Sequence, residues 1–87
     1  MTWPLPSLPL FESRQILGTQ DPAEARRLAR LELAQARPCP VCQVLLRHVT
    51  TLGVELRPRE LIDRLAPWER DEHSVRLAAA WIVLHAW

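Results

Sequence analysis

The most apolar stretch of the chain lies close to its C-terminal end, where every residue from 77 to 84 is apolar. It falls in a segment that opens with Pro67 and then carries Glu69 and Glu72, acidic residues that favour the positively polarised first turn of a helix. We therefore expect one helix over 67–86. A helix that is apolar all round cannot face water, so it must lie inside a core or against another chain.

A second helix is predicted over 22–37. Asp21 is a capping residue, Pro22 suits the first helical position, and Glu24 stands three residues after the cap. The helix should end before Pro38, because proline disfavours helical geometry in the residue that precedes it. Its apolar positions fall on one broad face: Ala25, Leu28, Ala29, Leu33 and Ala36.

Three shorter helices are expected over 9–17, 40–52 and 58–65. Gly18 and Gly53 follow the first two, as is typical of left-handed helix ends. In the segment 40–52 the residues at helical spacing, which we expect to face inward, are Val41, Leu45, Val49 and Leu52. In the segment 58–65 the inward residues are expected to be Leu61, Ile62 and Leu65.

The first nine residues have a different character. Prolines at positions 4, 6 and 9 remove amide donors and favour an extended arm, and the apolar residues between them argue that this arm packs on the bundle or on a partner. The fold class expected for the whole chain is therefore all-α. We expect one domain over residues 1–87: a compact bundle of four to five short helices with an extended, proline-rich N-terminal arm.

The amino-acid composition indicates the kind of genome and the cellular location to expect. Arginine supplies all 11 cations, while Lys, Asn and Tyr are absent. Their codons are A/T-rich, which suggests a GC-rich bacterial or phage genome. The net charge of +1 means that nucleic-acid binding would need a local patch. The start of the chain lacks the pattern of a signal peptide, and the terminal apolar run is shorter than the roughly 20 residues that cross a bilayer, so we expect a cytoplasmic protein without membrane contact.

Two cysteines three residues apart, Cys39 and Cys42, are the first candidate for chemistry. Each is expected at a helix start, where the helix dipole and nearby Arg37 favour the thiolate. Three interpretations remain open: inert core residues, a zinc site, or a redox pair. Zinc needs four ligands, and beyond this pair the chain offers only His48, His73 and His85. Residues 39–42 resemble the thioredoxin-type active-site pattern, which would imply redox activity; the resemblance covers these four residues only.

A stripe of arginines is the second candidate. Arg26, Arg27, Arg30 and Arg37 gather on an arc beside the apolar face of the helix 22–37. Their guanidinium groups could contact nucleic-acid phosphates or an acidic partner surface, and the alternative is a solvated face.

Residues 7–11 resemble the bacterial sliding-clamp-binding peptide, whose pattern is Gln-Leu-x-Leu-Phe. Leu8, Leu10 and Phe11 match its apolar anchors, whereas Ser7 replaces the signature Gln. The resemblance would imply docking of this segment on a sliding clamp, and the alternative is packing on the chain's own bundle.

The chain has four tryptophans, more than so small a core can bury completely, and tryptophan is enriched at binding hot spots. With only two glycines there is no phosphate-binding loop, and we identify no catalytic group, so we expect a non-enzymatic helical adaptor or regulator that binds a protein partner or a second copy. The alternative is a nucleic-acid-binding regulator that uses the arginine stripe, with zinc bound by the cysteine pair. The expected protein-binding residues are Trp3, Leu8, Leu10, Phe11, Trp81, Ile82, Leu84 and Trp87.

Overall fold

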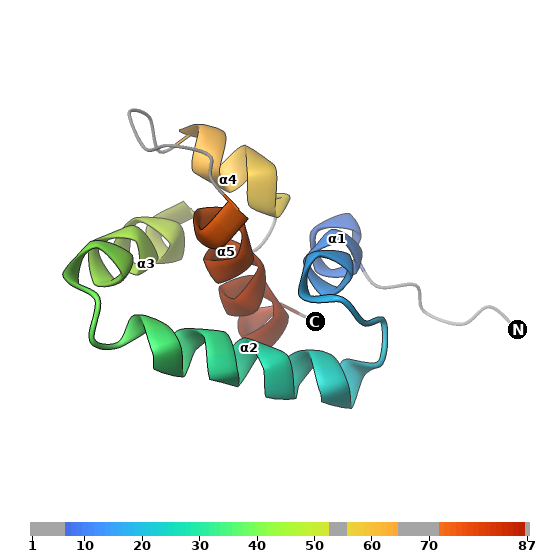
Figure 1. Ribbon diagram of the computed structural model, residues 1–87. Coiled ribbons are helices and arrows are strands. Elements are labelled where there is room, and N and C mark those ends of the chain that lie inside the picture. Colours follow the sequence, from blue (N-terminus) through green and yellow to red (C-terminus); the bar gives the residue numbers. More distant parts are fainter. Residues whose placement is uncertain (1–6, 53–55, 65–71, 87) are drawn as a thin grey trace, which may run out of the picture.

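The computed structural model describes residues 7–52, 56–64 and 72–86, and within these ranges it contains α-helices and no strand. The helices are α1 (Leu8–Leu17), α2 (Pro22–Ala36), α3 (Pro40–Leu52), α4 (Pro58–Arg64) and α5 (Glu72–His85), shown in Figure 1. The predicted all-α bundle is confirmed. None of these helices is long and apolar enough to cross a membrane.

The predicted bounds hold closely for the first three helices. The main difference is at α1, which begins at Leu8 rather than at Pro9, so the last two residues of the expected arm are helical. The Ser7 side chain caps this helix by accepting a hydrogen bond from the Leu10 N–H over 3.3 Å. The remainder of the expected arm, the expected helix end at Gly53 and the expected helix start at Pro67 lie outside the described residues.

The turn between α1 and α2 combines a helix end with a helix start. Gly18 adopts a φ of 99°, a left-handed conformation that costs glycine little, and Thr19 N–H reaches back to the Arg14 carbonyl over 3.1 Å. Asp21 then caps α2 by accepting a hydrogen bond from the Glu24 N–H at 3.1 Å. Both signals were predicted from the sequence, and together they set the direction in which α2 leaves α1.

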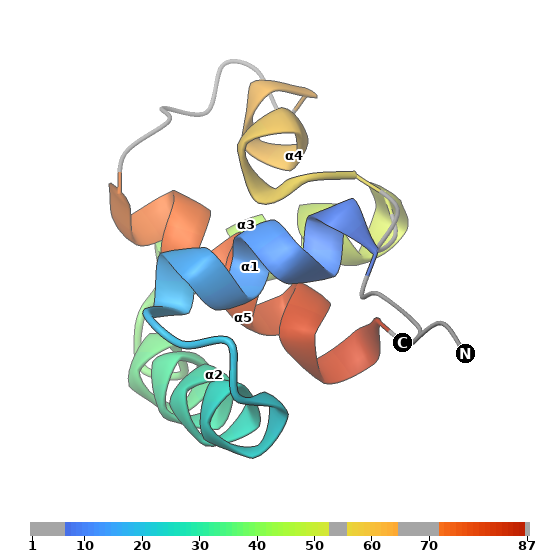
Figure 2. The ribbon, with the colours of Figure 1, turned by 90° about the vertical axis from the view of Figure 1, so that its right-hand side faces the viewer.

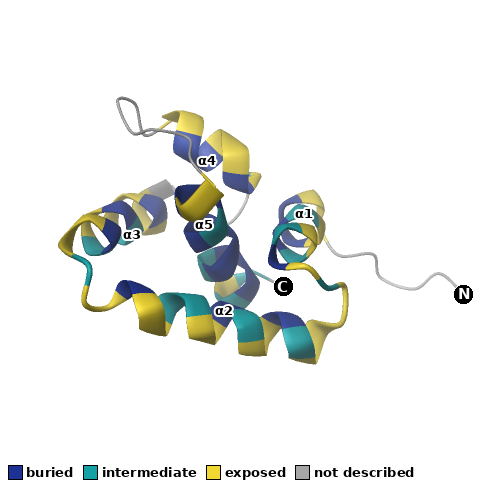
Figure 3. Cartoon of the chain, in the orientation of Figure 1, coloured by how far each residue is buried: buried dark blue, intermediate teal, exposed yellow. Residues whose placement is uncertain are grey.

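Helix α5 is the centre of the fold and packs against each of the other four helices. Figures 1 and 2 show α1 and α3 on opposite sides of α5, with α2 crossing below and α4 above. Figure 3 shows that burial is nearly continuous along this helix. Its fully enclosed side chains are Leu77, Ala78, Ala79, Ala80 and Ile82. The sequence left open whether this apolar helix lies inside a core or against another chain. In the structure it lies inside the core formed by the chain's own helices.

Helix α2 lies against α5 through small side chains. Ala25 and Ala29 of α2 belong to the same buried cluster as Ala79 and Ala80 of α5, and none of the four is accessible to solvent. Because alanine is small, the two helix backbones can approach closely. The predicted inward face of α2 is confirmed.

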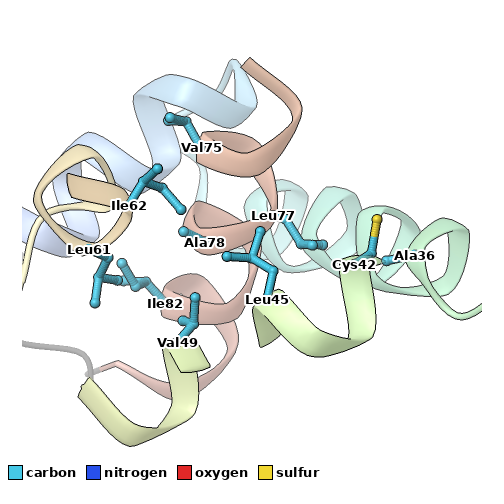
Figure 4. Close-up of a cluster of buried hydrophobic side chains, with 10 residues drawn as sticks. All are labelled: Ala36, Cys42, Leu45, Val49, Leu61, Ile62, Val75, Leu77, Ala78 and Ile82. Atoms are coloured by element: carbon cyan, nitrogen blue, oxygen red, sulfur yellow. The ribbon is translucent and has the colours of Figure 1, made fainter. Parts of the chain in front are cut away.

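A second cluster fills the space between α5, α3 and α4 (Figure 4). Its larger members are Leu45, Val49, Leu61, Ile62, Leu77 and Ile82, all fully buried or nearly so. The expectation that Leu61 and Ile62 face inward is confirmed, while Leu65 lies outside the described residues.

The inward face of α3 differs from the prediction at one position. Val41 was expected to face the core, yet it is 62% exposed, and Cys42 is buried instead at 6%. Among the α3 side chains that the structure describes, the inward set is therefore Cys42, Leu45 and Val49, spaced by three and then four residues. The side chain of Leu52, which was also expected to face inward, lies outside the described part of the chain.

One arginine ties α5 to two other helices. Arg76 donates from Nε to Glu32 of α2 over 2.8 Å and from a terminal nitrogen to the Ile16 carbonyl of α1 over 3.1 Å. Because the Glu32 side chain is mostly enclosed, this ion pair is sheltered from solvent more than a surface pair would be.

Candidate functional site

Cys39 stands directly before α3 and caps its first turn. Its carbonyl accepts the Gln43 N–H over 3.1 Å, and its Sγ accepts the Cys42 N–H over 3.4 Å. Pro40 follows at the first helical position, where the missing N–H costs nothing. The motif thus places a sulfur atom at a helix N-terminus, where backbone N–H groups favour negative charge.

The surroundings of Cys39 lower the pKa of its thiol. The largest cause is a hydrogen bond from the Cys42 thiol, followed by the hydrogen bond from the Cys42 backbone N–H. The Val41 N–H acts in the same direction, and partial burial opposes the shift. Cys39 is therefore the sulfur on which a thiolate forms more readily than on an ordinary cysteine.

Cys42 is the buried member of the pair. It belongs to the core cluster between α3 and α5, and Figure 4 shows it beside Ala36. Its Sγ lies 3.2 Å from His73 Nε2, a hydrogen-bonding distance for sulfur. Neither cysteine is in a disulfide.

From the sequence, His73 was only one of three histidines available to a zinc site, and its contact with Cys42 was not predicted. His73 stands among acidic residues, as is typical of a surface position, and it is exposed at the start of α5. Its ring nevertheless reaches Cys42 across 31 positions of the chain. No local spacing signals this contact, because it arises only when α5 packs against α3.

Cys39, Cys42 and His73 are also the residues to consider for the expected zinc site. Across ranges 7–52, 56–64 and 72–86, no group of three or more His, Cys, Asp and Glu side chains is arranged to hold a metal ion. A tetrahedral site needs four ligands. Zinc binding by Cys39 and Cys42 therefore stays a prediction.

The apolar residues expected at a protein interface divide into four groups, the last of which is the exposed pair Leu8 and Phe11. Leu10 and Ile82 are buried in the chain's own core, so in this fold they offer no surface to a partner. Trp81 and Leu84 are half-buried, and Trp81 stacks on His85 with ring centroids 4.7 Å apart. Trp3 and Trp87 lie outside the described residues.

Leu8 and Phe11 are the expected interface residues that remain exposed, at 54% and 44%. They stand three residues apart on the outer side of α1. The segment that resembles the clamp-binding peptide is part of this helix, and its central anchor Leu10 points into the core. In this fold, therefore, only two of its three apolar anchors are accessible.

The arginine stripe lies on the solvent side of α2 and at its C-terminal end. The members are Arg26, Arg27, Arg30 and Arg37, and all are exposed. Arg27 pairs with Glu24 of the same helix, which raises the pKa of Arg27 and lowers that of Glu24. Because Arg27 is paired with Glu24, its guanidinium is less available to a partner than those of the other arginines in the stripe.

Two features therefore stand out: the exposed Leu8 and Phe11 surface, and the thiol pair with its histidine, in which Cys39 is partly exposed and Cys42 is buried. The thiols and imidazole can exchange protons and form sulfur bonds, whereas the apolar surface can only bind. Comparison of the chain with protein-family models, curated proteins and solved structures finds no match.

Proposed function

We propose that this chain is a small helical adaptor that binds a partner protein on the outer face of α1. The observation that carries the proposal is the exposure of Leu8 and Phe11, at 54% and 44%, on a helix whose other face is already buried in the core. A leucine and a phenylalanine on the solvent side of one helix form an apolar contact surface of the kind that helps anchor protein interfaces.

The surroundings of this pair support a pre-formed surface. Gln20 donates from Nε2 to the Phe11 carbonyl over 3.1 Å, and Arg57 donates from Nε to Glu12 over 2.8 Å. The first contact fixes the turn after α1 to the helix, and the second joins α1 to the start of α4. A surface held in this way loses little conformational freedom on binding, which favours affinity.

The proposed interface lies on α1, whereas the sequence had pointed mainly to the C-terminal apolar helix. The apolar run of α5 suggested an interface, but that helix is enclosed by the chain's own helices. Trp81 and Leu84 of α5 are only half-buried, but Leu8 and Phe11 of α1 are the more exposed apolar side chains.

Nucleic-acid binding through α2 is supported less well. Four arginines are exposed there, but Arg27 already pairs with Glu24, and the chain carries a net charge of only +1. Binding to a phosphate backbone depends on many unpaired cations acting together. The apolar surface is therefore the better-supported interface.

The test compares partner capture by the native chain with capture by Phe11→Ser and Leu8→Ser. Leu31→Ser is the matched control, because Leu31 is also a leucine about half exposed but lies on α2. We expect a partner from the host cell to bind the native chain and the Leu31 variant, and to bind the Phe11 variant about tenfold or more weakly.

Light scattering over a range of concentrations accompanies the capture experiment. A dimer that dissociates in Phe11→Ser but not in Leu31→Ser would identify the partner as a second copy. Equal capture by all variants would contradict the proposed surface, as would a chain that stays monomeric and retains no protein.

A further inference from the structure

We propose that Cys39 and Cys42 form a thiol–disulfide exchange site, in which Cys39 attacks a disulfide substrate, Cys42 resolves the product and His73 receives the Cys42 proton. This activity goes beyond protein binding and does not depend on the α1 surface. It stands on three side chains that the fold brings together where the start of α3 meets α5: Cys39 before α3, Cys42 on α3 and His73 on α5.

The exposure of the two sulfurs assigns their roles. Cys39 is partly exposed and precedes Val41, which is 62% exposed, so an incoming disulfide can reach the start of α3. Cys42 is 6% exposed and cannot meet a large substrate directly. The accessible sulfur is therefore the attacking one, and the buried sulfur can act only on what Cys39 has already bound.

The single proton of the Cys42 thiol has two acceptors. It can be donated to Cys39 Sγ, the contact that lowers the pKa of Cys39, or directed to His73 Nε2 at 3.2 Å. While Cys39 is a thiolate, the first arrangement stabilises it. Once Cys39 has formed a bond to substrate sulfur, its negative charge is gone and the proton can move to His73 instead. The histidine thus promotes a thiolate on Cys42 at the stage when that thiolate is needed.

The reaction balances without a further cofactor. The Cys39 thiolate attacks one sulfur of a substrate disulfide, forming a mixed disulfide and releasing the other substrate sulfur as a thiolate. Cys42 then transfers its proton to His73 and attacks Cys39 Sγ, which forms the Cys39–Cys42 disulfide and releases the second substrate thiolate. The chain loses two electrons, the substrate gains them, and the proton held by His73 returns to solvent or to a product thiolate.

The fold accommodates both redox states with little rearrangement. Cys39 Sγ lies 3.4 Å from the Cys42 backbone nitrogen, so the Cys39 side chain is already turned toward Cys42 at the helix start. Because Cys39 precedes the helix rather than lying within it, side-chain rotation can close the bond while α3 stays in place.

The test uses the full chain in buffers of reduced and oxidised glutathione at fixed total concentration. The fraction of Cys39–Cys42 disulfide is followed by mass spectrometry after rapid alkylation. We expect a reversible, two-electron transition with a single midpoint, and far-UV circular dichroism that is unchanged on either side of it.

Variants assign the three roles. Cys42→Ala keeps a small apolar side chain in the core and should accumulate glutathione bound to Cys39. Cys39→Ser keeps a capping acceptor and should accumulate little glutathione, because Cys42 is buried. His73→Gln should react with glutathione disulfide at the native rate but resolve the mixed disulfide about tenfold or more slowly, the size typical of a positioned general base. His48→Gln is the control, because it makes the same substitution at an exposed histidine of α3, and it should behave as the native chain.

Several results would overturn the proposal. One is a folded chain whose thiols stay reduced in fully oxidised glutathione. Equal glutathione uptake by Cys39→Ser and Cys42→Ala would remove the assigned roles, and native resolution in His73→Gln would remove the histidine from the reaction. Purified chain that carries stoichiometric zinc, with both thiols blocked from exchange, would show a metal site in its place.

Discussion

Three helices in this protein begin with a side chain that accepts a hydrogen bond from the N–H three residues ahead. The acceptors are Ser7 for α1, Asp21 for α2 and Cys39 for α3, at 3.3, 3.1 and 3.4 Å. Asp21 could be recognised from its sequence neighbours, because Pro22 and Glu24 both agree with a helix start. Ser7 could not, because prolines on either side suggested an extended arm. The cap at Cys39 gives a reactive residue a structural role as well.

The first residue-scale prediction concerns the Asp21 cap. Asp21→Ala removes the acceptor for the Glu24 N–H and should lower the free energy of unfolding by about 0.5–2 kcal/mol, measured in urea. Asp21→Ser keeps an acceptor and should lose much less. Equal stability of Asp21→Ala and the native chain would show that the cap contributes nothing.

The second concerns the titration of Cys39. Because its pKa is lowered, alkylation of Cys39 by iodoacetamide should rise with pH around a midpoint below that of an ordinary cysteine. The thiolate then persists to lower pH, so the reaction stays faster near neutrality. Cys42→Ala removes the main hydrogen-bond donor and should move the midpoint upward. A native midpoint at or above the ordinary value would contradict the described hydrogen bonds.

At the scale of elements, hydrophobic spacing predicted well where the helices lie along the chain. It did not decide which face of α3 points into the core. Val41, Leu45 and Val49 are spaced by four and four residues, whereas Cys42, Leu45 and Val49 are spaced by three and four. Both sets fit a period of 3.6, and they differ by about 100° at the first member. The structure adopts the second set, with Cys42 in the core and Val41 in solvent. A core position was one of the interpretations left open for the cysteine pair, and buried Cys42 agrees with the behaviour of cysteine as a small apolar residue.

The close approach of α2 and α5 provides a prediction at this scale. Ala79→Leu inserts a larger side chain beside Ala25 and Ala29, where no solvent-accessible space exists, and should cost about 1–3 kcal/mol of stability. Ala34→Leu is the same change at an exposed position of α2 and should stay within about 0.5 kcal/mol of the native chain. Thermal unfolding compares the two. A stable Ala79→Leu would show that the two helices do not lie against each other as described.

At the scale of the whole molecule, the contacts that define the fold join residues far apart in the chain. Arg76 meets Glu32 and Ile16 across 44 and 60 positions, and His73 meets Cys42 across 31. Periodicity could show that α5 had to be covered, because an all-round apolar helix cannot remain in water. It could not show which helices cover it, since that depends on how the short connections direct each helix in space.

The Arg76 contacts can be tested directly. Arg76→Met keeps much of the side-chain volume but leaves Glu32 and the Ile16 carbonyl without this donor, so we expect a loss of about 1–3 kcal/mol in the free energy of unfolding. In a double-mutant cycle, Glu32→Gln should cost less in the Arg76→Met background than alone. Arg27→Met, which breaks an exposed pair within α2, is the control and should leave the urea midpoint nearly unchanged. Additive effects of the Arg76 and Glu32 changes would contradict the described pairing.

The central claim is that α5 is enclosed by its own chain, and amide hydrogen exchange tests it most directly. We expect the amides of residues 77–82 to exchange more slowly than those of any other described segment, with protection that does not depend on protein concentration. Rapid exchange in this segment, or protection that develops only as the concentration is raised, would show that the cover comes from another molecule and would contradict the described fold.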